Sequence, residues 1–143
     1  MALHRSHTVL TTAAPEAVWK RWTTPADWVT DDPGVDACEF PTPPTVGARG
    51  TLVSGGKQTI RFLELKECEA MDFEIVLPLG ALRFPHHMAP SPEGLRVRHG
   101  VRATGPLGWL YWLVAGRKIA AGLPEVMGLV VDHALAESVD AAS

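Results

Sequence analysis

Two histidines on neighbouring strand-like segments have the type and spacing that best suit chemistry. Within Leu82–Ala89, His86 falls on the apolar side of the alternation, together with Leu82, Phe84 and Met88. Within Leu95–Ala103, His99 does the same, together with Leu95, Val97, Val101 and Ala103. Because successive side chains of a strand point to opposite faces, both imidazoles are expected to face the interior.

The turn residues Ser91–Gly94 predict a hairpin between these two segments. If these residues form the loop, Pro90 faces Leu95 and His86 faces His99, whereas a register shifted by two residues makes the histidines diagonal neighbours. Such a pair can act as acid and base, because histidine titrates near neutral pH. The pair can equally hydrogen-bond a ligand, or consist of core histidines bonded to nearby backbone or water.

The remaining chemistry-bearing residues predict no metal ion and no cofactor. His87 follows His86 directly, but adjacent strand residues point to opposite faces. Neither Cys38 nor Cys68 belongs to a two-cysteine motif, and neither has an activating histidine beside it in the sequence. Gly-rich phosphate loops and the Gly-x-Ser-x-Gly elbow are absent from the sequence.

Arg61 lies on a strand-like segment whose alternation is ambiguous. Ile60 and Phe62 argue that its side chain points outward, whereas Leu63 and Leu65 argue the reverse. An inward arginine would bind a carboxylate or phenolate. An outward one is a solvated residue of the sheet surface, which is the commoner environment for arginine.

An apolar helix is expected over Leu107–Glu137, after Gly105-Pro106. At 100° per residue its charged side comprises Arg117, Lys118, Glu125 and Asp132. Its inward stripe comprises Trp109, Trp112, Gly116, Ala120, Leu123, Met127, Val130 and Ala134. Trp109 and Trp112 either line a cavity mouth or pack the helix onto the sheet, and Tyr111 points elsewhere, toward an exposed patch or dimer contact.

Small residues on that stripe have two interpretations. Gly116 and Ala120 serve either close packing or a wall that leaves room for a ligand. Gly122 and Pro124 weaken the helix and predict a kink or a break.

The rest of the chain reads as short strands and turns after two short helical segments. The expected elements are a strand over Ser6–Thr12, a helix over Pro15–Trp22, a turn over Pro25–Trp28, and strands over Val35–Phe40, Arg49–Ser54, Lys57–Lys66 and Met71–Leu77. Pro85 weakens the segment Leu82–Ala89 as a strand or places it at a sheet edge.

Composition sets the broad class of protein. The chain has 143 residues, 46% of them hydrophobic, and a net charge of −3, which suits one globular domain over residues 1–143 and gives no sign of nucleic-acid binding. Arg117, Lys118 and Glu125 interrupt the apolar C-terminal run, so no stable membrane insertion is expected. The polar N-terminus lacks a secretory core, which predicts a cytoplasmic protein with reduced thiols.

Several short segments then occur in a characteristic order: Ala14–Trp19, Trp28 with Asp32–Val35, Val46–Gly50, His99–Val101 and Gly105–Leu107. With them the chain resembles the SRPBCC (START-like, helix-grip) superfamily over nearly its whole length, in particular its polyketide cyclase/dehydrase and lipid-transport branch. The resemblance implies an α+β helix-grip fold: a curved antiparallel sheet of six or seven strands wrapped around a long C-terminal helix, with two short helices after the first strand. It does not specify a reaction, because this fold carries many functions.

Together these features predict a protein that binds a small hydrophobic molecule, lipid-, polyketide- or aromatic-like, in an internal cavity between sheet and C-terminal helix. The expected ligand-binding residues are Phe84, His86, Met88, Val97, His99, Val101, Trp109, Trp112, Gly116, Ala120 and Leu123. The alternative is a polyketide cyclase/dehydratase-type enzyme with His86 and His99 as its catalytic groups. A second alternative is a protein-interaction module, such as a homodimer, that uses the aromatic end of the last helix.

Overall fold

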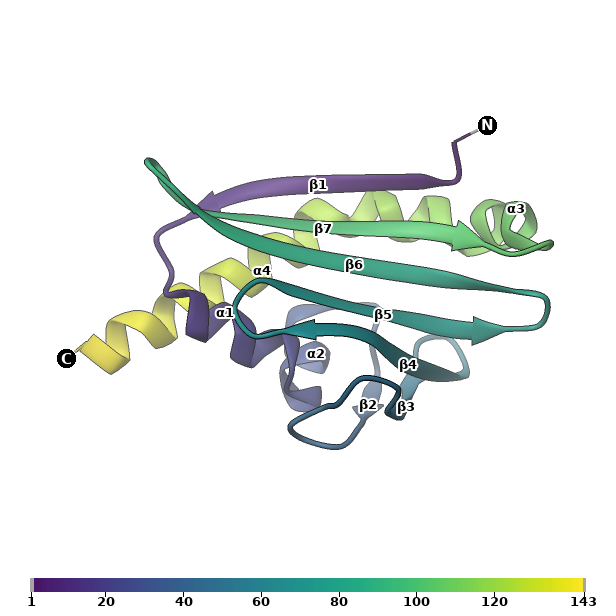
Figure 1. The fold of residues 1–143 in the computed structure, drawn as a ribbon, viewed down its shortest axis with the longest axis horizontal. Helices are drawn as coiled ribbons and strands as arrows, with labels where there is room; N and C mark the ends of the chain where they lie inside the picture. The colour runs from purple at the N-terminus through teal and green to yellow at the C-terminus, as the bar shows by residue number, and fades with distance from the viewer. Residues whose placement is uncertain (1, 143) are drawn as a thin grey trace.

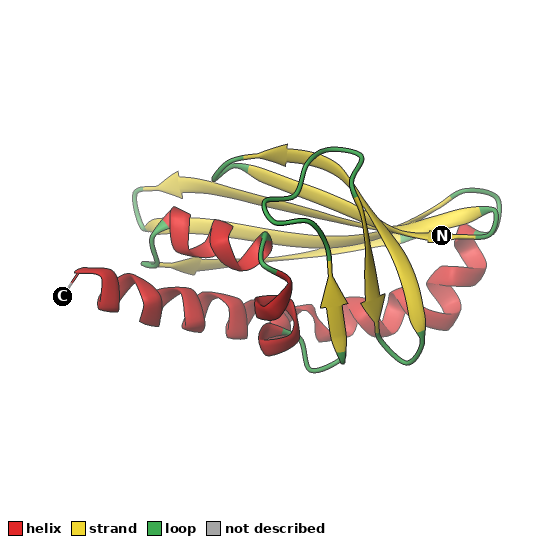
Figure 2. Ribbon diagram, turned by 90° about the horizontal axis from the view of Figure 1, so that it is seen from below, coloured by secondary structure: helices red, strands yellow, loops and turns green. Residues whose placement is uncertain are grey.

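The chain folds as one seven-stranded antiparallel sheet with its helices packed on a single face (Figures 1 and 2). The computed structural model describes residues 2–142. The strand order is β1-β7-β6-β5-β4-β3-β2. The strands are β1 (His4–Thr11), β2 (Ala37–Glu39), β3 (Arg49–Val53), β4 (Lys57–Lys66), β5 (Ala70–Leu77), β6 (Gly80–Ser91) and β7 (Gly94–Thr104).

The helical layer comprises two short helices after β1 and one long C-terminal helix, as the helix-grip fold predicts. Its elements are α1 (Pro15–Trp22), α2 (Pro25–Asp31), α3 (Gly108–Tyr111), a π-helical turn η1 (Trp112–Gly116), and α4 (Arg117–Ala142). By length and composition Gly108–Asp140 suffices to cross a membrane. In this fold it is the core helix, and it runs across the inner face of the sheet (Figure 2). Pro124 lies inside α4 without ending it.

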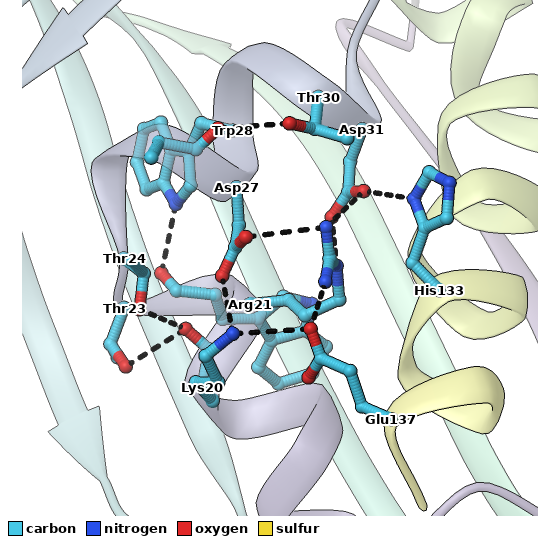
Figure 3. Close-up of polar contacts among 12 residues, drawn as sticks. Lys20, Arg21, Thr23, Thr24, Asp27, Trp28, Thr30, Asp31, His133 and Glu137 are labelled. Carbon is cyan, nitrogen blue, oxygen red and sulfur yellow. Dashed lines mark hydrogen bonds and ion pairs between the residues drawn. The ribbon is translucent and has the colours of Figure 1, made fainter. Parts of the chain in front are cut away.

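A network of charged side chains fastens α1 and α2 to α4 (Figure 3). Arg21 of α1 donates from Nε and Nη2 to the two carboxylate oxygens of Asp31, at 2.7 and 2.9 Å. From α4, Glu137 accepts from Arg21 Nη1 at 2.5 Å, and His133 Nδ1 lies 2.6 Å from Asp31 Oδ1. Arg21 and Asp31 are only 5% and 3% exposed. The network therefore holds α1 in one orientation over the sheet.

The π-helical turn η1 changes the phase of the C-terminal helix. From Trp112 onward the predicted inward stripe is buried, with Gly116, Ala120, Leu123, Met127, Val130 and Ala134 all facing the sheet. The prediction for Trp109 is wrong, because its side chain is 52% exposed. A π turn holds more residues than an α turn, so a wheel of constant 100° steps loses its phase across it. Tyr111 is instead half-buried, and its hydroxyl donates to the Pro78 carbonyl at 2.6 Å.

A β-bulge resolves the orientation of Arg61. The pairing of β4 with β5 shifts between Phe62 and Glu64, so Leu63 is the extra residue and the alternation reverses there. Arg61 therefore points outward, where its Nη2 donates to Glu74 at 2.6 Å. The conflicting patterns before and after Leu63 were each correct on their own side of the bulge.

Pro85 lies in an inner strand, and its predicted place at a sheet edge is wrong. β6 is flanked by β5 and β7 along its length. The ladder between β6 and β7 has no paired residues at Phe84 and Pro85, so the missing proline N–H breaks no regular pairing there. Gly100 lies opposite, and a Cβ at that position would come within 3.2 Å of Pro85 Cγ.

The buried ion pair predicts a large stability effect. Replacing Asp31→Asn leaves the Arg21 guanidinium without its buried carboxylate, so the free energy of unfolding is expected to fall by about 3 kcal/mol. Urea unfolding followed by circular dichroism measures this change. The control Asp132→Asn, on the exposed side of α4, is expected to change it by less than about 0.5 kcal/mol. Equal losses in the two variants would show that the network does not hold the helical layer.

Candidate functional site

The two predicted histidines meet on the inner face of the sheet. The hairpin register places Pro90 opposite Leu95 and His86 opposite His99, so the directly opposed arrangement is confirmed. The imidazole centroids are 3.8 Å apart, with 31° between the ring planes. The hairpin loop and the inward side of the alternation therefore bring both rings to one point of the sheet.

His86 is held in place by its own strand and by aromatic rings. Its Nδ1 lies 2.7 Å from the Phe84 carbonyl oxygen, so the Nδ1–H donates there and Nε2 is the unprotonated nitrogen of the neutral ring. Trp22 of α1 meets the ring edge-on at a centroid distance of 5.1 Å, and Phe73 of β5 lies at 5.9 Å. His86 is 5% exposed, so this enclosure is nearly complete.

Burial keeps both imidazoles neutral. It lowers the pKa of His86 to about 4, and the carbonyls of Phe84 and Met71 only partly oppose this effect. It also lowers the pKa of His99 well below its ordinary value, and the neighbouring His86 lowers it further. The pair therefore presents neutral hydrogen-bonding nitrogens at pH 7.

One of these nitrogens has no partner within the protein. Nε2 of His99 is buried, and no described residue forms a hydrogen bond with it. An unpaired buried polar group costs roughly 1–3 kcal/mol. A ligand's hydroxyl, amine or carbonyl could satisfy this nitrogen.

A third histidine, which sequence reasoning missed, extends the pair. His7 of β1 lies opposite His99, so His7, His99 and His86 form one row across β1, β7 and β6. His7 is half-buried and shares its side of β1 with Val9. That alternation was visible in the sequence, but the pairing of β1 with β7 was not. Within residues 2–142, no group of three or more His, Cys, Asp or Glu side chains is placed to hold a metal ion.

The aromatic wall was missed as well. Trp22 and Phe73 both contact the His86 ring, although neither stood among the predicted site residues. Their signal in the sequence is only that of ordinary core residues. Their role follows from the packing of α1 over β5 and β6.

The predicted apolar lining residues lie in the interior, with Trp109 as the exception. They are buried on the inner side of β6, β7 and the C-terminal helix: Phe84, Met88, Val97, Val101, Trp112, Gly116, Ala120 and Leu123. Beside Gly116 the Trp112 ring fills the space, because a Cβ added at this glycine would lie 2.6 Å from Trp112 Cε3. Gly116 therefore serves close packing in this conformation. A ligand bound there would have to move Trp112 or its neighbours.

Two hollows stand out on the described part of the chain, and both lie away from the histidine pair. One is a shallow depression between β1 and α4, bordered by Leu10, Thr11, Val131 and Leu135 among others. The second lies on the outer face of the sheet.

Thiol chemistry does not suit this site. Cys38 and Cys68 are both free and half-buried. Burial raises the pKa of the Cys38 thiol to about 12 and raises that of Cys68. A thiolate nucleophile at neutral pH is therefore disfavoured at both positions.

Comparison with known structures places this geometry in context. No family model matches the sequence, and no curated protein matches it. A protein from Nitrosomonas europaea is 14% identical, with a TM-score of 0.72 over 96% of this chain and 97% of that one. The di-domain ARO/CYC StfQ from the steffimycin biosynthetic pathway is 12% identical, with a TM-score of 0.70 over 98% of this chain and 52% of its own. A putative protein in the dynemicin biosynthetic locus is 15% identical, with a TM-score of 0.68 over 93% of this chain and 47% of its own.

The chain has the helix-grip fold that the resemblance to the SRPBCC superfamily implied. The predicted resemblance is thus confirmed at the level of the fold, which is what likeness at such low identity shows. The curved sheet, the two short helices and the long C-terminal helix all match the elements that the resemblance predicts.

The packing of Gly116 makes a prediction with an internal control. Gly116→Ala is expected to lower the free energy of unfolding, because the added methyl group must displace the Trp112 ring. In Gly122→Ala, nothing lies within 4 Å of the new methyl group, so helix propensity should stabilise the protein by up to about 1 kcal/mol. Urea unfolding measures both. If both substitutions stabilise to the same degree, Trp112 is not packed against Gly116.

The neutral histidines predict a pH dependence of stability. Between an unfolded pKa of about 6.5 and the folded pKa of His86, the unfolded chain binds a proton that the native ring does not. Stability is therefore full above pH 6.5 and falls as the pH drops toward the folded pKa, by up to about 1.4 kcal/mol per pH unit for each such histidine. His86→Phe should flatten this slope between pH 6.5 and 5. The exposed His87→Phe should change it far less, because His87 lowers the pKa of His86 less than burial does, and identical slopes in both variants would rule out a buried neutral His86.

Proposed function

We propose that this protein binds a small, mostly apolar molecule between the sheet and the C-terminal helix, and that a polar group of the molecule bonds to His99. The observation that carries the proposal is the buried, unpartnered Nε2 of His99. A ligand hydroxyl, amine or carbonyl at that nitrogen would recover the hydrogen bond that the protein leaves unmade. The surrounding apolar and aromatic side chains would bury the rest of the ligand.

Binding requires a second arrangement of the core. Phe84, Met88, Val97, Val101 and Leu123 are all buried in the structure, and Trp112 fills the space at Gly116. We infer that the ligand displaces some of these side chains, among them Trp112, which lies against Gly116, and the flexible Met88. Methionine adapts easily to a new neighbour because its side chain is unbranched and flexible.

An enzyme of the polyketide cyclase/dehydratase type is the alternative. The fold shared with the ARO/CYC StfQ and the two facing imidazoles support it. The pKa of His86, about 4, argues for binding over catalysis, because a general base works best with a pKa near the operating pH. A catalytic role would need the bound substrate to raise that pKa.

Protein interaction is the second alternative. Trp109, Leu110, Leu113 and Val114 are exposed at the start of the C-terminal helix, as an interaction module would require. Concentration-dependent association without any small molecule, measured by light scattering, would favour this role and a homodimer.

A cytoplasmic location with reduced cysteines stays a prediction from the sequence.

The binding proposal is tested with a neutral apolar dye that carries one N–H group, N-phenyl-1-naphthylamine. Its fluorescence is expected to rise saturably on binding to the wild-type protein at pH 7. His99→Phe keeps a ring of similar size but removes Nε2, so it should weaken affinity about tenfold. His87→Phe, on the outer face, should not change it.

Two results would count against the proposal. The first is an absence of saturable dye binding combined with no co-purified small molecule by native mass spectrometry. The second is an equal affinity in the wild type and the His99→Phe variant, which would leave His99 as a core histidine.

A further inference from the structure

The outer face of the sheet carries a polar hollow that the proposed ligand site does not use. It measures about 360 Å³ and is bordered by residues of β1, β4, β5, β6 and β7. Its floor follows one row of opposed residues across these strands: Ser6, Gly100, Pro85, Asp72 and Glu64. Gly100 has no side chain and Pro85 is compact, so the floor is lowest at its centre.

Two arginines, one on each side of this row, form hydrogen bonds with residues of the row. Arg98 comes from the row that contains Thr8, and its Nε and Nη2 donate to Ser6 Oγ at 3.2 and 3.1 Å. Arg83 comes from the row on the other side, and its Nη2 donates to Asp72 Oδ2. Each guanidinium is thus held near one end of the floor. Because a guanidinium has five N–H donors, both retain donors for a ligand.

Asp72 supplies the second, independent observation. Its residue is 7% exposed although it lies on the outer face, and its buried Oδ1 has no hydrogen-bond partner among the described residues. Burial raises the pKa of this carboxyl group, whereas its hydrogen bond with Arg83 lowers it. An ionised carboxylate oxygen accepts hydrogen bonds only, so Oδ1 is suited to a donor on a bound molecule.

We propose that this hollow binds a small molecule that joins an oxyanion, phosphate or carboxylate, to a neighbouring hydroxyl or ammonium group. The oxyanion takes the free N–H donors of Arg98 and Arg83, and the neighbouring donor meets Asp72 Oδ1. Planar guanidinium groups match the spacing of phosphate and carboxylate oxygens. With Arg102 also on the rim, guanidinium groups outnumber the carboxylates of Asp72 and Glu64, so an anion is favoured.

Glycerol 3-phosphate is a suitable probe, because it carries an oxyanion and hydroxyl donors in a size that the hollow accommodates. Titration followed by NMR should show saturable shifts at residues of the floor row. Sulfate, which lacks a donor at neutral pH, and glycerol, which lacks charge, should each bind at least about tenfold more weakly. Sulfate that binds as tightly as glycerol 3-phosphate would overturn the role of Asp72.

The matched pair of variants is Arg98→Gln and Arg96→Gln, two positions on the same face of β7. Arg98→Gln should weaken the affinity for glycerol 3-phosphate about tenfold or more. Arg96 does not border the hollow, so Arg96→Gln should change this affinity by less than about twofold. Equal losses would mean general charge attraction and would overturn the site, as would an absence of saturable binding to the wild type. Arg102→Gln gives a second test if Arg98→Gln misfolds.

Ligand binding at the inner site is measured separately in the same variants. N-phenyl-1-naphthylamine affinity should stay unchanged in Arg98→Gln, because this side chain is exposed on the opposite face of the sheet. A loss of dye binding together with glycerol 3-phosphate binding would indicate damage to the fold and overturn the assignment of two independent sites.

Discussion

The buried ion pair of Arg21 with Asp31 constrains how the helices pack on the sheet. A buried guanidinium and carboxylate are tolerated only when their hydrogen-bonding groups are satisfied, and the partners here come from α1, α2 and α4 together. The short helices therefore cannot take their places independently of the long one. Trp22 follows Arg21 in α1, so the orientation fixed by the ion pair also sets the aromatic wall against His86.

Two local irregularities decide which side chains reach the interior. The π-helical turn at Trp112–Gly116 brings Trp112 inward, seats its ring on Gly116 and leaves Trp109 outside. The bulge at Leu63 keeps Ile60 and Leu65 on the same inner face while Arg61 points out to Glu74. In both places one extra residue shifts the regular repeat of the helix or strand, and so changes which side chains face the interior.

Neighbouring residues of β6 and β7 build the two candidate sites on opposite faces of the sheet. His86 and His99 form the inner, neutral pair, whereas Pro85 and Gly100, each one residue away, form the floor of the outer hollow. The inner face is apolar and keeps its imidazoles uncharged, so it suits a weakly polar ligand. The outer face is lined with arginines and suits an anion. Because side chains alternate along a strand, the same two strands can line an apolar site on one face of the sheet and an anionic-ligand site on the other.

The sequence by itself determined the order of most elements and the inward side of His86 and His99, because periodicity and alternation are local properties, and the resemblance of its short segments implied the helix-grip fold. It left two registers open for the hairpin, and the tertiary structure decided that the two histidines lie directly opposite each other. Only the tertiary structure decided that β1 pairs with β7 and so adds His7 to the row, since that pairing joins distant segments. The same holds for the Arg21–Asp31 network and for Pro85 in an inner strand. The exposure of Trp109 escaped the helical wheel because the wheel assumes a constant turn, whereas the helix has a π turn at Trp112–Gly116.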